Sequence, residues 1–125
     1  MIREVLTIDA EESVAEACRI MGEKHVGSLI VTTQDKPLGI FTERDLLSKI
    51  ILKRLKLEEI KVKEYMSEPL TVINPDFHLK EVARIMTRLK ISRLPVIEDE
   101  KLVGIVTSSE LIHVMARDPL ELIGG

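Results

Sequence analysis

The chain has 125 residues and a formal net charge of −3 at pH 7, and 45% of its residues are hydrophobic. This balance predicts one folded domain, or two small halves that share a core, and it argues against wholesale disorder and a general affinity for polyanions. Aromatic residues make up only 2% of the chain, so stacking platforms for single-stranded nucleic acid are not expected.

The sparse cysteine and histidine residues limit redox and metal chemistry. Cys18 is the only cysteine, which excludes an intramolecular disulfide and favours a reducing compartment. His25, His78 and His113 lie far apart without ligand spacing, so no metal site is expected. Neither a signal peptide nor an apolar run of about 18 residues is recognisable, and we therefore expect a cytoplasmic protein that has no membrane segment.

The first half of the chain predicts alternating strands and helices. Apolar residues at Val14, Ala17, Cys18 and Met21 follow a helical spacing, and Ser13 and Glu16 suit a capping box at the start of that helix. The other expected elements are a strand over 5–8, a hairpin of strands 28–33 and 38–41 with a polar turn over 34–37, and a closing helix that begins at Thr42 and continues to Leu55.

The second half repeats this order at an offset of 65 residues without a gap. The aligned residues include Glu16, Arg19, Ile20 and Met21 with Glu81, Arg84, Ile85 and Met86, and Gly39, Ile40 and Thr42 with Gly104, Ile105 and Thr107. The expected elements are a short leader helix over 62–66, a strand over 70–73, a helix that starts after His78, a hairpin of strands 93–98 and 102–106 with a polar turn over 98–101, and a helix from Thr107.

A long repeat used only twice predicts a closed pair and not a solenoid. We place the first repeat with its connecting helix at 1–57, and the second repeat with its leader helix and C-terminal tail at 58–125. Each unit is too small for a robust core of its own, so we expect the two to pack sheet to sheet with pseudo-two-fold symmetry as one cooperative module.

The stretch Gly39-Ile40-Phe41-Thr42-Glu43-Arg44-Asp45 carries the candidate site. It predicts a strand end, a hydroxyl residue at the turn and a carboxylate in the first turn of a helix. Such a helix start can hold a polar or anionic ligand, and its carboxylate can accept hydrogen bonds from two sugar hydroxyls. Thr-x-x-Asp is also close to a capping box, which needs no ligand, so both interpretations remain open.

The tandem order of elements, with segments 26–31 and 39–45, resembles a pair of cystathionine-beta-synthase-type (CBS) domains, known as a Bateman module. The resemblance covers about 5–47 and 66–115. It implies an α/β (α+β) fold and a non-catalytic sensor that binds an adenosine-containing ligand in a cleft between the repeats. No cofactor is required in such a sensor, because the nucleotide is its regulatory ligand.

The resemblance also implies roles for individual residues. Thr42 and Asp45 would hold ribose. Arg93 would approach phosphate, and Arg44 is a weaker candidate for the same role. Ser92 stands where stronger nucleotide binders of the family often have His. The apolar slot for adenine would be formed by Ile8, Val31, Ile40 and Pro95. The second repeat departs from the pattern, because Glu110 replaces the aspartate after Thr107; there we favour a helix cap and predict one competent cleft.

We therefore expect a regulatory module for AMP, ADP or ATP, with S-adenosylmethionine or NAD as alternative ligands. A ligand-free dimerisation or scaffold module is the second hypothesis. An enzyme is not expected, because no nucleophile or acid–base set is recognisable. Family members pair as homodimers, and the apolar helices over 46–55 and 111–115 would form that surface. A regulated enzyme or transporter is the expected target, and nucleic acid is not an expected partner.

Overall fold

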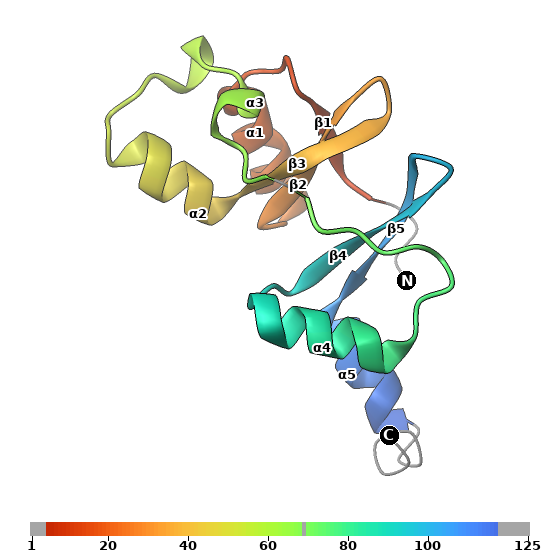
Figure 1. Ribbon diagram of the computed structural model, residues 1–125. Helices are drawn as coiled ribbons and strands as arrows, with labels where there is room; N and C mark the ends of the chain where they lie inside the picture. Colours follow the sequence, from red (N-terminus) through yellow and green to blue (C-terminus); the bar gives the residue numbers. More distant parts are fainter. Residues whose placement is uncertain (1–4, 69, 118–125) are drawn as a thin grey trace. The chain divides into compact units, whose positions relative to one another are not determined.

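The computed structural model describes residues 5–68 and 70–117, with the side chains of 115–117 excepted. The chain divides into two compact units, one from Leu6 to Leu70 and the other built mainly on the residues from Thr71 onward. Both are mixed α/β units in which a helix, two antiparallel strands and a second helix follow one another (Figure 1).

The first unit is a three-stranded sheet with helices. Its elements are β1 (Thr7–Asp9), α1 (Val14–Lys24), β2 (Ser28–Thr33), β3 (Lys36–Thr42), α2 (Glu43–Asp45), which runs on into the π-helical Leu46–Ile51, a 3-10 turn at Leu57–Glu59, and α3 (Val62–Tyr65). The strand order is β1-β2-β3, with β1 parallel and β3 antiparallel to β2. Val14, Ala17 and Met21 of α1 point into the core with Leu29 and Val31 of β2, as their spacing predicts.

The second unit repeats this plan with a smaller sheet. It contains α4 (Leu79–Leu89), β4 (Arg93–Glu98), β5 (Lys101–Thr107) and α5 (Ser108–Arg117), and its core gathers Val82, Met86, Leu94, Val96, Val106 and Leu111. The strand expected over 70–73 is wrong: only Ile73 forms a parallel bridge, with Val96. Val72 is 43% exposed, and the chain turns at once at Asn74, whose side chain accepts a hydrogen bond from the backbone N–H of Asp76.

The two hairpins turn more tightly than the sequence suggests. Gln34 and Asp35 connect β2 to β3, and their φ angles of 50° and 66° are those of a two-residue type I′ turn. Asp99 and Glu100 repeat this geometry between β4 and β5. The four-residue turns expected over 34–37 and 98–101 are therefore wrong, because left-handed backbone is reached without glycine.

The helix ends also differ in detail from the expectation. The Ser13 hydroxyl caps α1 by accepting from the N–H of Glu16, but Glu16 pairs with Arg19 and does not close the capping box. The helix after Thr42 stops at Ile51 and not at Leu55, because Arg54 adopts a left-handed φ of 56°.

The segment 58–66 packs with the first unit, although the repeat assigns it to the second half. Val62 is fully buried in the first core, and its N–H donates to the Glu12 carbonyl over 3.0 Å. The Val14 N–H donates to the Ile60 carbonyl in return, over 2.9 Å. The spatial boundary at Leu70 therefore lies later than the repeat boundary at 57/58.

Glu11, in the turn between β1 and α1, makes a further connection to this segment, and it provides a pH-dependent test. Its carboxylate bonds Lys61 over 2.6 Å and Lys63 over 2.5 Å, and these hydrogen bonds lower the pKa of Glu11 from 4.5 to about 2. As the pH falls, the unfolded chain therefore takes up the proton before the folded chain does. The stabilisation that ionised Glu11 gives the folded state is present above pH 4.5 and is lost as the pH falls through about 2.

We expect Glu11→Gln to flatten the decline of the melting temperature between pH 4.5 and about 2, measured by circular dichroism. Parallel curves for the two proteins would contradict this.

Candidate functional site

A buried carboxylate lies at the centre of the candidate site. Asp45 is 3% exposed, and it is the one charged side chain classed as buried in the part of the chain that the structure describes. It sits in the first turn after β3, where Thr42 is still extended with φ −119° and ψ 165°. A buried carboxylate is stable only where hydrogen-bond donors replace its water, so its partners define the site.

One edge of the Asp45 carboxylate belongs to the helix cap. Its Oδ2 accepts the Thr42 N–H over 2.9 Å and the Thr42 hydroxyl over 3.0 Å. The Asp45 N–H donates in turn to the Thr42 Oγ1 over 3.2 Å, so the capping box is complete. The capping interpretation of Thr-x-x-Asp is thus confirmed, and this edge is fixed by the backbone.

The other edge is held by two side chains from further along the chain. Oδ1 of Asp45 accepts the Ser67 hydroxyl over 2.8 Å and lies 2.8 Å from the Lys49 Nζ. The same Nζ donates to the Tyr65 carbonyl over 3.0 Å. A carboxylate offers about four acceptor positions, so all of them are filled by protein groups.

Ser67 reaches Asp45 because its backbone is paired to β3. Ile40 donates to the Ser67 carbonyl over 3.1 Å, and Ser67 donates to the Ile40 carbonyl over 2.8 Å. This close approach crosses Gly39, where an added Cβ would lie 2.7 Å from the Ser67 carbonyl oxygen and 2.9 Å from the Met66 sulfur. Glycine is therefore required at 39 by space, not by backbone conformation.

The remaining site candidates of the first unit differ in accessibility. Ile8 and Val31 are buried core residues and ladder partners, whereas Ile40 is only half-buried. The Arg44 side chain is exposed, and its carbonyl accepts the Ser48 hydroxyl over 2.6 Å.

In the second unit, the candidates gather at the start of β4. Arg93 is half-buried and pairs with Thr107 in the ladder, while Ser92 is exposed and its carbonyl accepts the Ser108 N–H over 2.8 Å. Pro95 is fully buried. The Glu110 N–H donates to the Thr107 hydroxyl over 3.1 Å, so the hydroxyl half of the expected cap is present.

Comparison with known proteins decides the family. The CBS domain profile matches this chain twice, at residues 1–52 and 62–117. The chain belongs to the CBS domain family. Its tandem CBS domains form a regulatory module, and the expected α/β fold of two tandem repeats is confirmed.

Solved structures and curated relatives agree with this assignment. A putative signal-transduction protein with CBS domains from Burkholderia ambifaria is 29% identical, with a TM-score of 0.83 over 93% of this chain and 85% of that one. The CBS domain-containing protein YhcV of Bacillus subtilis is 30% identical over 89% of this chain and 79% of its own length. MK0525 of Methanopyrus kandleri is 33% identical over 90% of this chain.

This chain corresponds to only part of many relatives. It spans 58%, 42% and 63% of the length of MK0525 and of the Methanocaldococcus jannaschii proteins MJ1225 and MJ0450. It aligns with 23% of an inosine-5'-monophosphate dehydrogenase from Korarchaeum cryptofilum, at 33% identity. Among the described residues of this chain, no helix has the length and apolar character of a membrane span.

Two residues of the first CBS repeat's site were missed by sequence reasoning. Lys49 stands four residues after Asp45, which is a helical ion-pair spacing that the sequence does display. Ser67 is 22 residues away and belongs to the connection between the repeats, so no local pattern identifies it. Only the pairing of Ser67 with Ile40 brings its hydroxyl to the carboxylate.

Replacement of Gly39 tests the geometry of this CBS site. Gly39→Ala forces Ser67 or Met66 to move, and we expect a loss of about 1–3 kcal/mol in the free energy of unfolding, measured with urea. Gly22→Ala is the matched control, because Gly22 lies within α1 with no atom within 4 Å of an added Cβ, and there we expect a gain of up to about 1 kcal/mol. Equal effects of the two substitutions would contradict the role assigned to Gly39.

Proposed function

We propose that this CBS pair senses an adenosine-containing nucleotide such as AMP, ADP or ATP, and that Asp45 receives the ribose. The observation that carries the proposal is the bond from the Ser67 hydroxyl to Asp45 Oδ1. A hydroxyl donor already occupies the position that a sugar hydroxyl would take. The carboxylate is thus oriented and desolvated for this type of partner before any ligand arrives.

The two edges of Asp45 have different roles in this proposal. Thr42 keeps its hold on Oδ2, because those bonds also complete the helix cap. At Oδ1, one ribose hydroxyl replaces Ser67, which is exposed and returns to water. The second ribose hydroxyl replaces Lys49, whose side chain is 40% exposed and retains the Tyr65 carbonyl as a partner. The exchange therefore leaves no buried donor without a partner.

The remaining ligand contacts extend the same proposal. The half-buried Ile40 is better placed to meet an adenine ring than Val31, Ile8 and Pro95, which are all buried. Arg44 and Arg93, with Ser92, are the candidates for phosphate, since guanidinium groups bind phosphate through paired hydrogen bonds. S-adenosylmethionine and NAD share the ribose and remain alternative ligands.

The regulatory output follows from population shift. Ligand binding changes the equilibrium only to the extent that the nucleotide binds one state of the module more tightly than another. Release of Ser67 supplies such a difference, because Ser67 lies in the segment that leads out of the first unit at Leu70. The alignment with part of inosine-5'-monophosphate dehydrogenases is compatible with a module that controls an attached or separate enzyme.

Two substitutions with opposite expected effects test the proposal. The wild-type protein is titrated calorimetrically with AMP, ADP, ATP, S-adenosylmethionine and NAD. We expect Asp45→Asn to weaken the binding of the preferred ligand by about tenfold or more, because one acceptor oxygen and the charge are lost. We expect Ser67→Ala to tighten binding several-fold, because the ligand no longer competes with the Ser67 hydroxyl.

Ser48→Ala is the matched control for loss of a hydroxyl. Ser48 lies on the helical segment that continues from Asp45, but its hydroxyl bonds the Arg44 carbonyl and not the Asp45 carboxylate. Its substitution should therefore leave the affinity for the nucleotide unchanged. Absence of binding to wild-type protein would refute nucleotide sensing. Binding that Ser67→Ala leaves unchanged would refute the exchange at Oδ1 alone.

Pairing of two copies is the second proposed function, and exposed apolar residues favour it. Leu47 and Leu52 are 59% and 78% exposed, and Ile112 on α5 is 67% exposed. The expected faces are narrower than the sequence suggests, because Ile50 and Leu111 are core residues. The side chain of Met115, which the sequence assigns to the same surface, lies outside the described residues. A CBS-CP12 protein that is 32% identical to this chain is hexameric.

Light scattering at high concentration tests the pairing. We expect twice the chain mass for the wild type and monomers for the double variant Leu47→Glu, Leu52→Glu, since charges oppose burial of that face. Leu38→Glu is the control, because Leu38 is exposed on β3 and is not among the residues of the proposed faces, so this variant should leave the dimer intact. A monomeric wild type would contradict the proposal.

A further inference from the structure

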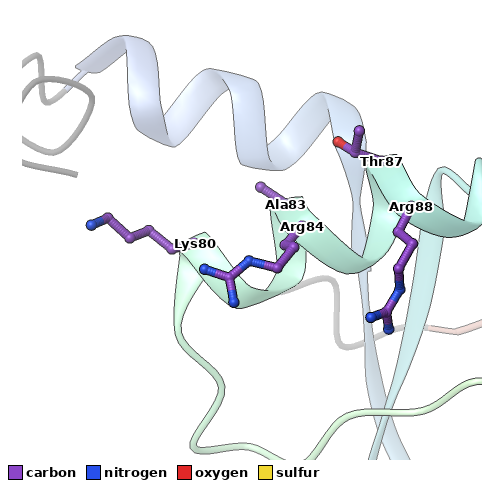
Figure 2. A pocket seen from close by; sticks show the side chains of 5 residues that line it. All are labelled: Lys80, Ala83, Arg84, Thr87 and Arg88. Atoms are coloured by element: carbon purple, nitrogen blue, oxygen red, sulfur yellow. The ribbon is translucent and has the colours of Figure 1, made fainter.

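One face of α4 carries an unneutralised row of cations, which we name the α4 basic stripe and define as Lys80, Arg84 and Arg88. The residues are four apart and all exposed, so they recur on the same side of the helix. Figure 2 shows Arg84 and Arg88 leaving α4 on the same side. With Ala83 and Thr87, the stripe lines an open hollow of about 490 Å³.

The aligned face of α1 in the first repeat has balanced charges. The residues that align with the stripe are Ala15, Arg19 and Glu23 of α1. Arg19 bonds Glu23 over 2.7 Å and also bonds Glu16, so its charge is balanced within the helix. These carboxylates raise the pKa of Arg19, and Arg19 lowers the pKa of Glu16. The two helices share a fold position and differ in charge.

The second repeat has no such balance. Glu81 precedes Arg84 by the same three residues, yet among the residues that the structure describes no ion pair joins any member of the stripe to an acidic side chain. Like charges four residues apart destabilise a helix by a few tenths of a kcal/mol, and a cation in the first turn opposes the helix dipole. Arg88 suits the last turn, but within the described part of the chain neither an ion pair nor the helix dipole stabilises the charges of Lys80 and Arg84 in α4.

The surroundings of the stripe resemble a protein-binding surface. Leu89, the next residue of α4 after Arg88, is exposed, and Ile112 is exposed on α5, the helix that contacts α4. Arginine beside exposed apolar groups is a common composition at protein interfaces. A nucleic acid would contact at most the three phosphates that the stripe neutralises and would leave the apolar groups unused.

We propose that the α4 basic stripe docks an acidic helical segment of a partner protein. Four residues of a helix rise about 6 Å, so glutamates at i, i+4 and i+8 of the partner match the spacing of Lys80, Arg84 and Arg88. The two guanidinium groups can each bind a carboxylate through paired hydrogen bonds. This surface is independent of Asp45, and it gives the second repeat a role that the first lacks.

Fluorescence anisotropy with a defined probe tests the inference. The probe is a labelled alanine-rich helical peptide with three glutamates at four-residue spacing, and a glutamine version is its control. We expect the full chain to bind the glutamate peptide at low salt, with about tenfold weaker binding of the glutamine peptide and of the variant Lys80→Glu, Arg84→Glu, Arg88→Glu. Circular dichroism shows whether each variant is folded.

A second basic cluster provides a charge-matched control. Lys53, Arg54 and Lys56 are also exposed, and their replacement by glutamate changes the net charge by the same amount. We expect affinity for the peptide to stay within about twofold in that variant, because the contacts are local. Equal loss in both triple variants, no binding to wild-type protein, or tighter stripe-dependent binding of a short DNA duplex at the same salt would each overturn the inference.

Discussion

A carboxylate that is withdrawn from water must have its acceptor positions filled, and in the first CBS repeat this requirement falls on Asp45. Three parts of the chain meet it: the helix cap at Thr42, Lys49 one turn later, and Ser67 from the connecting segment. The close packing of that segment on Gly39 and its backbone pairing with Ile40 both bring Ser67 into reach. The local fold and the proposed ligand site therefore depend on the same carboxylate.

This arrangement reconciles the two interpretations of Thr-x-x-Asp. The cap uses one edge of the carboxylate and the proposed ribose site uses the other, so structural and binding roles coexist on one residue. The partners at the second edge are the exposed Ser67 and the partly exposed Lys49, and water can readily solvate these side chains once they are released. Folding has already removed the Asp45 carboxylate from water, so the ligand only has to replace two of its hydrogen-bond donors.

The repeats share a plan but not their surfaces. Glu110 replaces the aspartate in the second copy, and the face of α4 is cationic where α1 is internally paired. Both differences lie outside the apolar spacing that builds the two hydrophobic cores. Two copies can therefore keep the same core while one specialises in a small ligand and the other, as we propose, in a protein partner.

Most of the fold could be predicted from the sequence, because it rests on spacing. The apolar residues of α1 and α4 and the continuous apolar strands show the elements directly, and the offset of 65 residues shows the repeat. Turn geometry could not be predicted, since Gln34 and Asp35 enter left-handed backbone without glycine. The contact of Lys49 with Asp45 could be predicted from its helical spacing. The contact of Ser67 with Asp45 could not, because it spans 22 residues and depends on tertiary pairing.

The most direct test of the account compares AMP with its 2',3'-dideoxy analogue by calorimetry on the same protein. The two ligands share base and phosphate and differ only in the hydroxyls that are proposed to replace Ser67 and Lys49 at Asp45. We expect the dideoxy analogue to bind at least about tenfold more weakly, since two hydrogen bonds to a charged acceptor are lost. Equal affinity for the two ligands would show that Asp45 does not receive the ribose.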